Sequence, residues 1–276
     1  MSIQSGLDAF STGSLSKPRV RRLPDPPEDS ELKHLIAPNW MFDFDVETIP
    51  EIDTLRQRIR DATYATDPVE EWSYILGDHI SYGNKKLADH IAIFNMRSAH
   101  DCPNLGTNYC QVDAEDCYAV RSEDNYPQPL SYRRRQQIIW GYLDATTWAR
   151  AFRRHYERKQ TPVSTIRFNE SGDFQSRHDL FKLDEIARQL EDIVDVYTYS
   201  ASSWLPWEEV EHFVLNRSND RREFGDRRFE VVDSVDEIPD GGIRCPHDQS
   251  DGEIHCGDCR LCLDADAPNV YVKNFY

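Results

Sequence analysis

The chain has 276 residues, enough to bury one sizeable core together with a smaller appendage. Its formal net charge of -17 keeps the surface hydrated and repels polyanions at long range. The longest apolar runs, such as 91–94, are far shorter than the roughly 20 residues of a membrane-spanning helix, and no hydrophobic signal segment is found, so we expect a cytoplasmic protein with no membrane span.

Arg outnumbers Lys, and Asp outnumbers Glu, among the charged residues. There are 25 Arg against 7 Lys, and 30 Asp against 19 Glu. An excess of Asp with scarce Lys suits a high-salt cytoplasm, where short carboxylates hold water while salt screens charge. The composition therefore indicates a halophilic archaeal host, or a virus or plasmid of such a host, rather than an ordinary acidic protein.

Four segments follow one another along the chain. Residues 1–38 are rich in Ser, Pro and charge without periodicity, and they predict a flexible leader. Residues 39–87 predict an N-terminal helical elaboration, in which 51–72 shows a weak helical spacing of apolar residues. Residues 88–240 alternate strand and helix patterns, and 241–276 form a cysteine-rich C-terminal segment.

The central segment has the pattern of a β/α fold. Helical spacing predicts a long Arg-rich helix at 131–158, a strongly periodic helix at 180–193 and a short helix at 207–211. Strands that alternate with helices form a parallel sheet with covering helices. We therefore expect an α/β fold, a partial (open) β/α barrel with sites at the carboxyl ends of its strands, and an ordinary doubly wound sheet is the competing fold. The predicted strands lie at 90–95, 163–168, 194–199, 212–215 and 228–232.

Four cysteines near the C-terminus have metal-ligand spacing. Two consecutive C-x-x-C steps bring three sulfurs within reach of one ion or cluster, and Cys245 supplies a fourth. Four thiolates suit structural zinc or an iron–sulfur cluster, and His247 or His255 could replace one of them. In a hydrophilic segment this spacing favours metal binding over unliganded cysteines. The four are Cys245, Cys256, Cys259 and Cys262.

A second group follows the first predicted strand and consists of Cys102, Cys110 and Cys117. An odd total of seven cysteines in a cytoplasmic protein argues against a disulfide framework. Three thiolates could hold three irons of a [4Fe–4S] cluster and leave the fourth iron open. Alternatively, His100 would complete a closed zinc site, or one thiolate would act as a nucleophile, for which no partner base is recognisable. We favour a metal over none, and iron–sulfur over zinc.

Residues 170–174, Glu-Ser-Gly-Asp-Phe, follow the second predicted strand. Gly172 would let the backbone approach a ligand, and Glu170 or Asp173 could accept hydrogen bonds from an amine or from ribose hydroxyls. The alternative is a strand-to-helix turn in which Asp173 or Ser176 caps the next helix. Other polar residues could line the same pocket or simply end their strands: Asn95, Asn169, Thr198, Ser200 and Asn216.

The predicted helix at 131–158 is basic within an acidic protein. Its arginines could track a nucleic-acid backbone, which makes nucleic acid a candidate partner. Pairing with local carboxylates on a solvated face is the alternative that we favour. The arginines are Arg133, Arg134, Arg135, Arg150, Arg153 and Arg154.

Several short motifs together resemble the phage-borne gene product 88 proteins of actinobacteriophages and mobile elements. They extend over roughly residues 83–262, and the resemblance implies an organisation rather than a reaction. The motifs are Gly83-Asn-Lys-Lys-Leu87, His100-Asp-Cys-Pro103, Cys117-Tyr-Ala119, Arg167 with Ser171-Gly-Asp-Phe174, Val196-Tyr-Thr-Tyr-Ser200, and the C-terminal cysteines.

The layout is also similar to radical S-adenosylmethionine enzymes. That resemblance implies a reactive [4Fe–4S] cluster on the first cysteine group and an auxiliary cluster on the second. It implies S-adenosylmethionine held through its methionine amine by Ser171, Gly172 and Asp173. In that superfamily three and two residues separate the cysteines, whereas here seven and six do.

The sequence is therefore consistent with two alternative functions. The first is an iron–sulfur enzyme that uses S-adenosylmethionine on an unknown substrate, with the cofactor carrying the chemistry. The second is a non-enzymatic, zinc-stabilised binding protein of a virus or mobile element, because four-cysteine sites commonly fold small segments without catalysis.

Overall fold

We describe the fold from a computed structural model, which describes residues 51–84, 86–159, 162–220 and 222–273. The expected leader at 1–38 lies outside the described residues. Among the helices of the described ranges, none is long and apolar enough to cross a membrane.

The N-terminal helical stretch is two helices, α1 (Glu51–Thr63) and α2 (Pro68–Gly77), rather than one. The break is local in origin. Asp67 caps α2 by accepting a hydrogen bond from Glu70 N at 3.1 Å. Pro68 occupies the first turn, where backbone N–H groups have no partner within the helix, so the missing N–H of proline costs no hydrogen bond.

An eight-stranded open sheet forms the centre of the molecule, in the order β1-β2-β3-β4-β5-β6-β8-β7. β1 runs antiparallel to β2, and all other neighbouring strands are parallel. The five predicted strands are confirmed as β2 to β6, with ends shifted by up to three residues. The strands are β1 (Ser81–Tyr82), β2 (Ile91–Phe94), β3 (Thr165–Phe168), β4 (Asp195–Ser200), β5 (Val214–Ser218), β6 (Arg227–Val232), β7 (Ile243–Arg244) and β8 (Val270–Lys273).

The prediction of one helix at 131–158 is wrong, because the stretch holds two helices. The chain leaves the first at Leu143, and Asp144 caps the second by accepting from Thr147 N at 2.8 Å. The periodic helix is confirmed as α6, and Ser176 caps it as the structural alternative expected. The helices after α2 are α3 (Tyr118–Asn125), α4 (Pro127–Tyr142), α5 (Ala145–Arg158), α6 (Arg177–Leu190), α7 (Pro246–Gln249) and α8 (Cys256–Cys259), with 3₁₀ turns at Trp207–Glu209, Val235–Glu237 and Leu261–Leu263.

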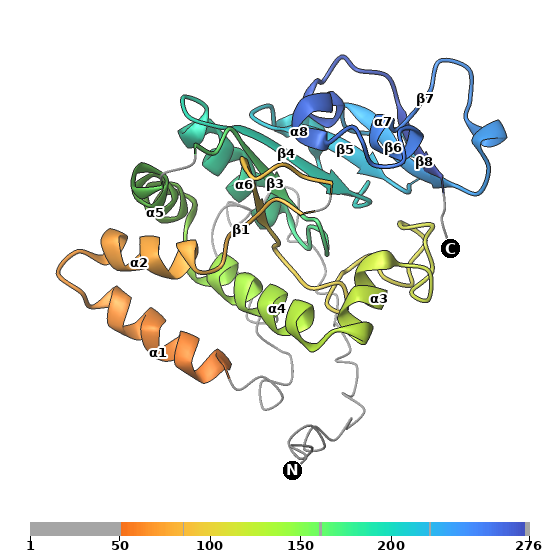
Figure 1. Cartoon of the computed structure of the whole chain (residues 1–276). Coiled ribbons are helices and arrows are strands. Elements are labelled where there is room, and N and C mark those ends of the chain that lie inside the picture. The colour runs from red at the N-terminus through yellow and green to blue at the C-terminus, as the bar shows by residue number, and fades with distance from the viewer. Residues whose placement is uncertain (1–50, 85, 160–161, 221, 274–276) are drawn as a thin grey trace, which may run out of the picture.

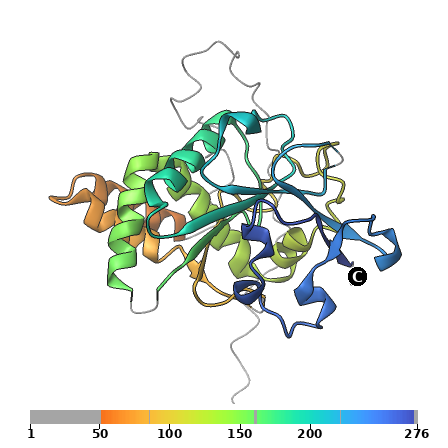
Figure 2. The same ribbon diagram turned by 90° about the horizontal axis from the view of Figure 1, so that it is seen from above.

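The two faces of the sheet are covered differently. Ala92, Phe94, Ile166 and Phe168 point to one face and share a buried apolar cluster with residues of α1, α2, α4, α5 and α6. The opposite face carries a smaller cluster, in which Tyr197 and its neighbours pack against cysteines of the C-terminal segment. Figure 1 shows α1, α2 and α4 below the sheet and α8 above it. From above, the C-terminal segment runs from the middle of the molecule toward the side opposite α1 and α2 (Figure 2).

The molecule is thus a mixed α/β protein with an open sheet, and no closed barrel forms among the described residues. The strand order from β2 to β6 follows the sequence without reversal, and the long helices share one apolar cluster on one face. A doubly wound sheet reverses its order and carries helices on both faces, so that competing fold is wrong.

Candidate functional site

The first cysteine group lies in the loop that follows β2, at the carboxyl edge of the parallel sheet. Burial, and next the nearby Asp173, Cys110 and Cys117, raises the pKa of the Cys102 thiol well above its usual value. Burial also raises the pKa of Cys110 to about 11, and Asp173 and Cys117 add to the effect. The three cysteines therefore lie within electrostatic range of one another and of Asp173.

Buried ion pairs hold this loop in place. The Glu123 carboxylate accepts hydrogen bonds from Ala99 N at 2.8 Å and His100 N at 3.1 Å, and it pairs with Arg133 at 2.8 Å. Asp101 accepts two hydrogen bonds from the Arg134 guanidinium, at 2.9 and 3.1 Å. Carboxylates that are paired and hydrogen-bonded in this way fix backbone geometry as well as charge.

Four of the six arginines of these helices pair with local carboxylates, in line with the alternative that we favoured over a nucleic-acid surface. Arg133 and Arg134 are buried and point inward from α4 to the cysteine loop. On α5, Arg153 pairs with Asp192 and Arg154 with Glu70.

Asp173 lies beside the first cysteine loop because β2 and β3 are adjacent parallel strands. Its carboxylate accepts from Ser200 Oγ at 2.6 Å, from the backbone N–H of Phe174 and Ala201 at 2.7 Å each, and from Asn104 Nδ2 at 2.7 Å. Burial raises the pKa of Asp173 to about 6, although these hydrogen bonds act in the other direction. Four donors fill the acceptor capacity of a carboxylate.

Ser171 and Gly172 fasten the same edge. Ser171 N donates to Asn95 Oδ1 at 2.8 Å, at the end of β2. Gly172 has φ +74°, and a Cβ there would stand 2.6 Å from Arg97 O, so only glycine allows this approach. As placed, the Ser171–Asp173 segment joins the β3 end to the cysteine loop.

The four C-terminal cysteines gather over the face of the sheet opposite the helices. Burial, with smaller contributions from Cys262, Cys245 and Cys259, raises the pKa of Cys256 to about 11. The segment is anchored to the sheet, since Cys256 N donates to Lys86 O at 2.9 Å and Asn216 Nδ2 donates to Cys262 O at 3.0 Å. The structure thus brings Cys245 to the two C-x-x-C steps.

Of the histidines that could complete these groups, His100 and His247 each have one ring nitrogen near an oxygen of the protein. His100 Nε2 lies 2.9 Å from Asp124 Oδ1. His247 Nδ1 lies 2.9 Å from Ile254 O, and the ring of His255 lies 6.2 Å from that of His247. Within the described ranges, no three His, Cys, Asp or Glu side chains are arranged closely enough to hold a metal ion as they stand.

Most of the polar residues at the strand ends bond to the protein itself. Asn95 bonds to Gln136 at 3.0 Å, Asn169 Oδ1 accepts from Met96 N at 3.2 Å, and Thr198 donates to Phe168 O at 3.3 Å. They stabilise the carboxyl edge rather than line an opening there.

Arg167 on β3 was not predicted as a site residue. It projects from the face that carries the C-terminal cysteines, and its positive charge lowers the pKa of Cys256 and Cys262 against the larger effect of burial. The available signal was an arginine inside an otherwise apolar strand, Thr-Ile-Arg-Phe.

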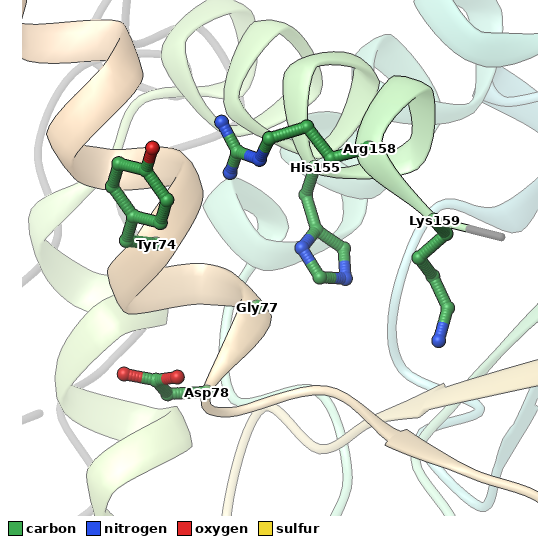
Figure 3. A pocket seen from close by; sticks show the side chains of 6 residues that line it. All are labelled: Tyr74, Gly77, Asp78, His155, Arg158 and Lys159. Carbon is green, nitrogen blue, oxygen red and sulfur yellow. The ribbon is translucent and has the colours of Figure 1, made fainter.

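A separate cavity of about 270 Å³ lies where α2 and α5 end, and no cysteine lines it (Figure 3). Its basic residues already have partners. Arg158 pairs with Glu70 at 2.9 Å, the Lys159 ammonium lies 3.2 Å from the centroid of the Tyr82 ring, and His155 Nε2 lies 2.6 Å from Tyr82 Oη. These contacts account for the charges around the cavity without a ligand.

Comparison with known protein families gives a match to a family model. The family model described as gene product 88 matches residues 75–265, which is more than half of the chain. No curated protein and no solved structure matches.

Proposed function

The chain belongs to the gene product 88 family, and from that premise we propose that it is an iron–sulfur protein with two cysteine sites. Cys102, Cys110 and Cys117 would hold a [4Fe–4S] cluster with one open iron. The C-terminal cysteines Cys245, Cys256, Cys259 and Cys262 would hold an auxiliary cluster.

The observation that carries the proposal is the gathering of thiols within each group. Cys110 and Cys117 add to the burial that raises the pKa of Cys102, and Cys262 and Cys245 add to the burial that raises the pKa of Cys256, so the thiols of each group lie within electrostatic range of one another. Thiols that disfavour one another's ionised form gain stability from a bound cation, which deprotonates them outright. The donor set fits iron–sulfur chemistry.

The number of cysteines favours iron–sulfur over zinc at the first group. Three thiolates would hold three irons of a cluster and leave the fourth position open, whereas a closed zinc site would also need Nδ1 of His100, whose Nε2 lies 2.9 Å from Asp124 Oδ1. A structural zinc site is four-coordinate and closed. An open position suits a cluster that binds an outside ligand.

S-adenosylmethionine is the outside ligand that the proposal assigns to the open position. When bound to a reduced cluster, it supplies hydrogen-atom abstraction. Because four protein donors occupy Asp173, a methionine amine would have to replace one of them, for example Asn104. We therefore assign Ser171, Gly172 and Asp173 chiefly to positioning the cysteine loop.

The filled carboxylate of Asp173 also favours a second candidate, a zinc-stabilised binding protein without catalysis. In that case both cysteine groups are closed, and 171–173 is only a strand-to-helix connection. The metal and an exchangeable ligand separate the two functions.

The test is anaerobic purification of the full chain, followed by iron, zinc and sulfide analysis and an absorption spectrum with and without S-adenosylmethionine. We expect iron and sulfide for two clusters and a spectral change on adding the cofactor. The variant Cys110→Ser should lose the change and one cluster, while Cys259→Ser should lose the other cluster and keep the change. Zinc without sulfide would overturn the proposal in favour of the binding protein.

A further inference from the structure

Arg167 lies between the two cysteine groups, on the face of the sheet opposite the helices. In the strand register it stands beside Ile93 of β2 and Tyr197 of β4, whose side chains share that face. Its guanidinium carbon lies 4.6 Å from the centroid of the Tyr199 ring. The C-terminal cysteines Cys256 and Cys262 are within its electrostatic range.

The first cysteine group reaches the same place through Tyr118, the residue after Cys117. Tyr118 is about half exposed, and its hydroxyl lies within electrostatic range of the Arg167 guanidinium. The Tyr118 hydroxyl donates to Glu170 O, which ties it to the end of β3. Arg167 thus lies among the side chains of Tyr197, Tyr199 and Tyr118, with the C-terminal cysteines on one side and the residue after Cys117 on the other.

The Arg167 guanidinium has no hydrogen-bonded partner among the described residues. Its Nε is buried without an acceptor, and no ion pair to Arg167 occurs in the part of the chain that the structure describes. Glu170 is near, but its carboxylate accepts from Asn84 Nδ2 at 2.7 Å. The side chain as a whole is only partly covered, so it remains accessible from solvent.

Other inward-pointing arginines have an acceptor within the protein. Arg134 has Asp101 at 2.9 Å, Arg133 has Glu123 at 2.8 Å, and Arg227 of β6 donates to Leu261 O. In a chain with 49 acidic residues, a strand arginine without one indicates that its counter-charge comes from elsewhere.

We propose that Arg167 binds the carboxylate or phosphate group of a small-molecule ligand between the two cysteine groups. A planar guanidinium presents paired N–H donors that match both groups bidentately, and the stacked Tyr199 ring holds its plane. The ligand's anionic end would lie against Arg167, with the rest between Tyr118 and Tyr197. This site is argued from Arg167 and its neighbours alone, and it stands whether or not the cysteines hold iron.

The test is thermal unfolding of the full chain with increasing inorganic phosphate or acetate, at ionic strength matched with chloride. We expect a saturable rise in Tm with at least one of the two anions, and the stronger one identifies the ligand class. Arg167→Gln should weaken the apparent affinity at least tenfold. Arg167→Lys keeps the charge and loses the paired donors, so its apparent affinity for the anion should lie between those of the unaltered chain and Arg167→Gln.

The matched control is Arg150→Gln, which removes an exposed arginine of α5 and should bind the anion like the unaltered chain. Equal stabilisation of the Arg167→Gln variant and the unaltered chain would overturn the proposal, as would the absence of saturable stabilisation by both anions. If Arg167→Gln does not fold, Arg167→Lys decides by the same criterion. Metal content measured on the same samples separates this result from that of the iron–sulfur proposal.

Discussion

At the residue scale, the interior is organised around buried carboxylates that each serve several donors. Asp179 is the clearest case. It is fully buried, pairs with Arg97 at 2.9 Å, and accepts from Trp140 Nε1 at 2.7 Å and Gln175 N at 2.9 Å. Burial acts to raise its pKa, but Arg97 and the hydrogen bonds outweigh burial and hold the pKa below its usual value.

Replacing Asp179 by Asn should lower the free energy of unfolding by about 3–5 kcal/mol, because it leaves the Arg97 charge buried without its carboxylate. Equilibrium urea unfolding measures the loss. The control is Glu185→Gln, which breaks an exposed pair with Arg188 and should change stability by less than about 1 kcal/mol. Similar losses of unfolding free energy in both variants would contradict the prediction that the buried pair of Asp179 and Arg97 contributes more to stability than an exposed pair.

Asp173→Asn should lower the free energy of unfolding by about 1–3 kcal/mol, because an amide nitrogen cannot accept from donors that now bond to a carboxylate oxygen. The loss should appear in denaturant unfolding with no S-adenosylmethionine present. Asp192→Asn, at an exposed carboxylate, is the comparison. A variant as stable as the original chain, but unable to respond to S-adenosylmethionine, would return Asp173 to a direct role in binding.

At the scale of elements, a lysine side chain of α6 caps the C-terminal end of α4. The Lys182 amine donates to Trp140 O and Leu143 O, carbonyls that the helix itself leaves unpaired. The same amine lies 4.1 Å from the centroid of the Trp140 ring. Burial lowers the pKa of Lys182 to about 7, while Asp179 and Asp144 oppose the shift.

This contact predicts a pH dependence. The unfolded chain keeps the Lys182 proton up to about pH 10.4, whereas the folded chain releases it near pH 7. Between those values the unfolded state binds more protons, so the stability contributed by this residue rises with pH. From about pH 7 to pH 8.5 the free energy of unfolding should rise by about 1 kcal/mol or more relative to Lys182→Met. The prediction is refuted if the free energy of unfolding changes equally with pH in the unaltered chain and in Lys182→Met.

The elements that sequence could predict are those with strong apolar patterns. β2 to β4 and α6 bury apolar residues at regular spacing, and their positions are confirmed to within three residues. β1 and β7 have two residues each, too few to show alternation. The break between α4 and α5 had a signal in Asp144-Ala-Thr-Thr, an N-cap followed by a helix start, but the arginines on both sides suggested continuity.

At the scale of the whole molecule, the sequence could group the cysteines but not locate the groups. Their spacing indicates two sets, whereas the position of the second set over the sheet depends on contacts such as Cys256 N to Lys86 O at 2.9 Å. Such a contact joins residues 170 positions apart and has no local pattern. The same reason kept Arg167 from being recognised, since its surroundings come from β4, α3 and the C-terminal segment.

The late position of the C-terminal segment in the chain has a consequence for biosynthesis. One face of β2 to β4 can pack as soon as β4 has left the ribosome, because all the helices that cover it come from earlier or intervening sequence. The other face, with Arg167 and Tyr197, stays open to water until residues 245–262 are made. The nascent chain therefore passes through a stage in which its helical layer is complete and its cysteine-covered layer is still accessible to whatever is delivered to it.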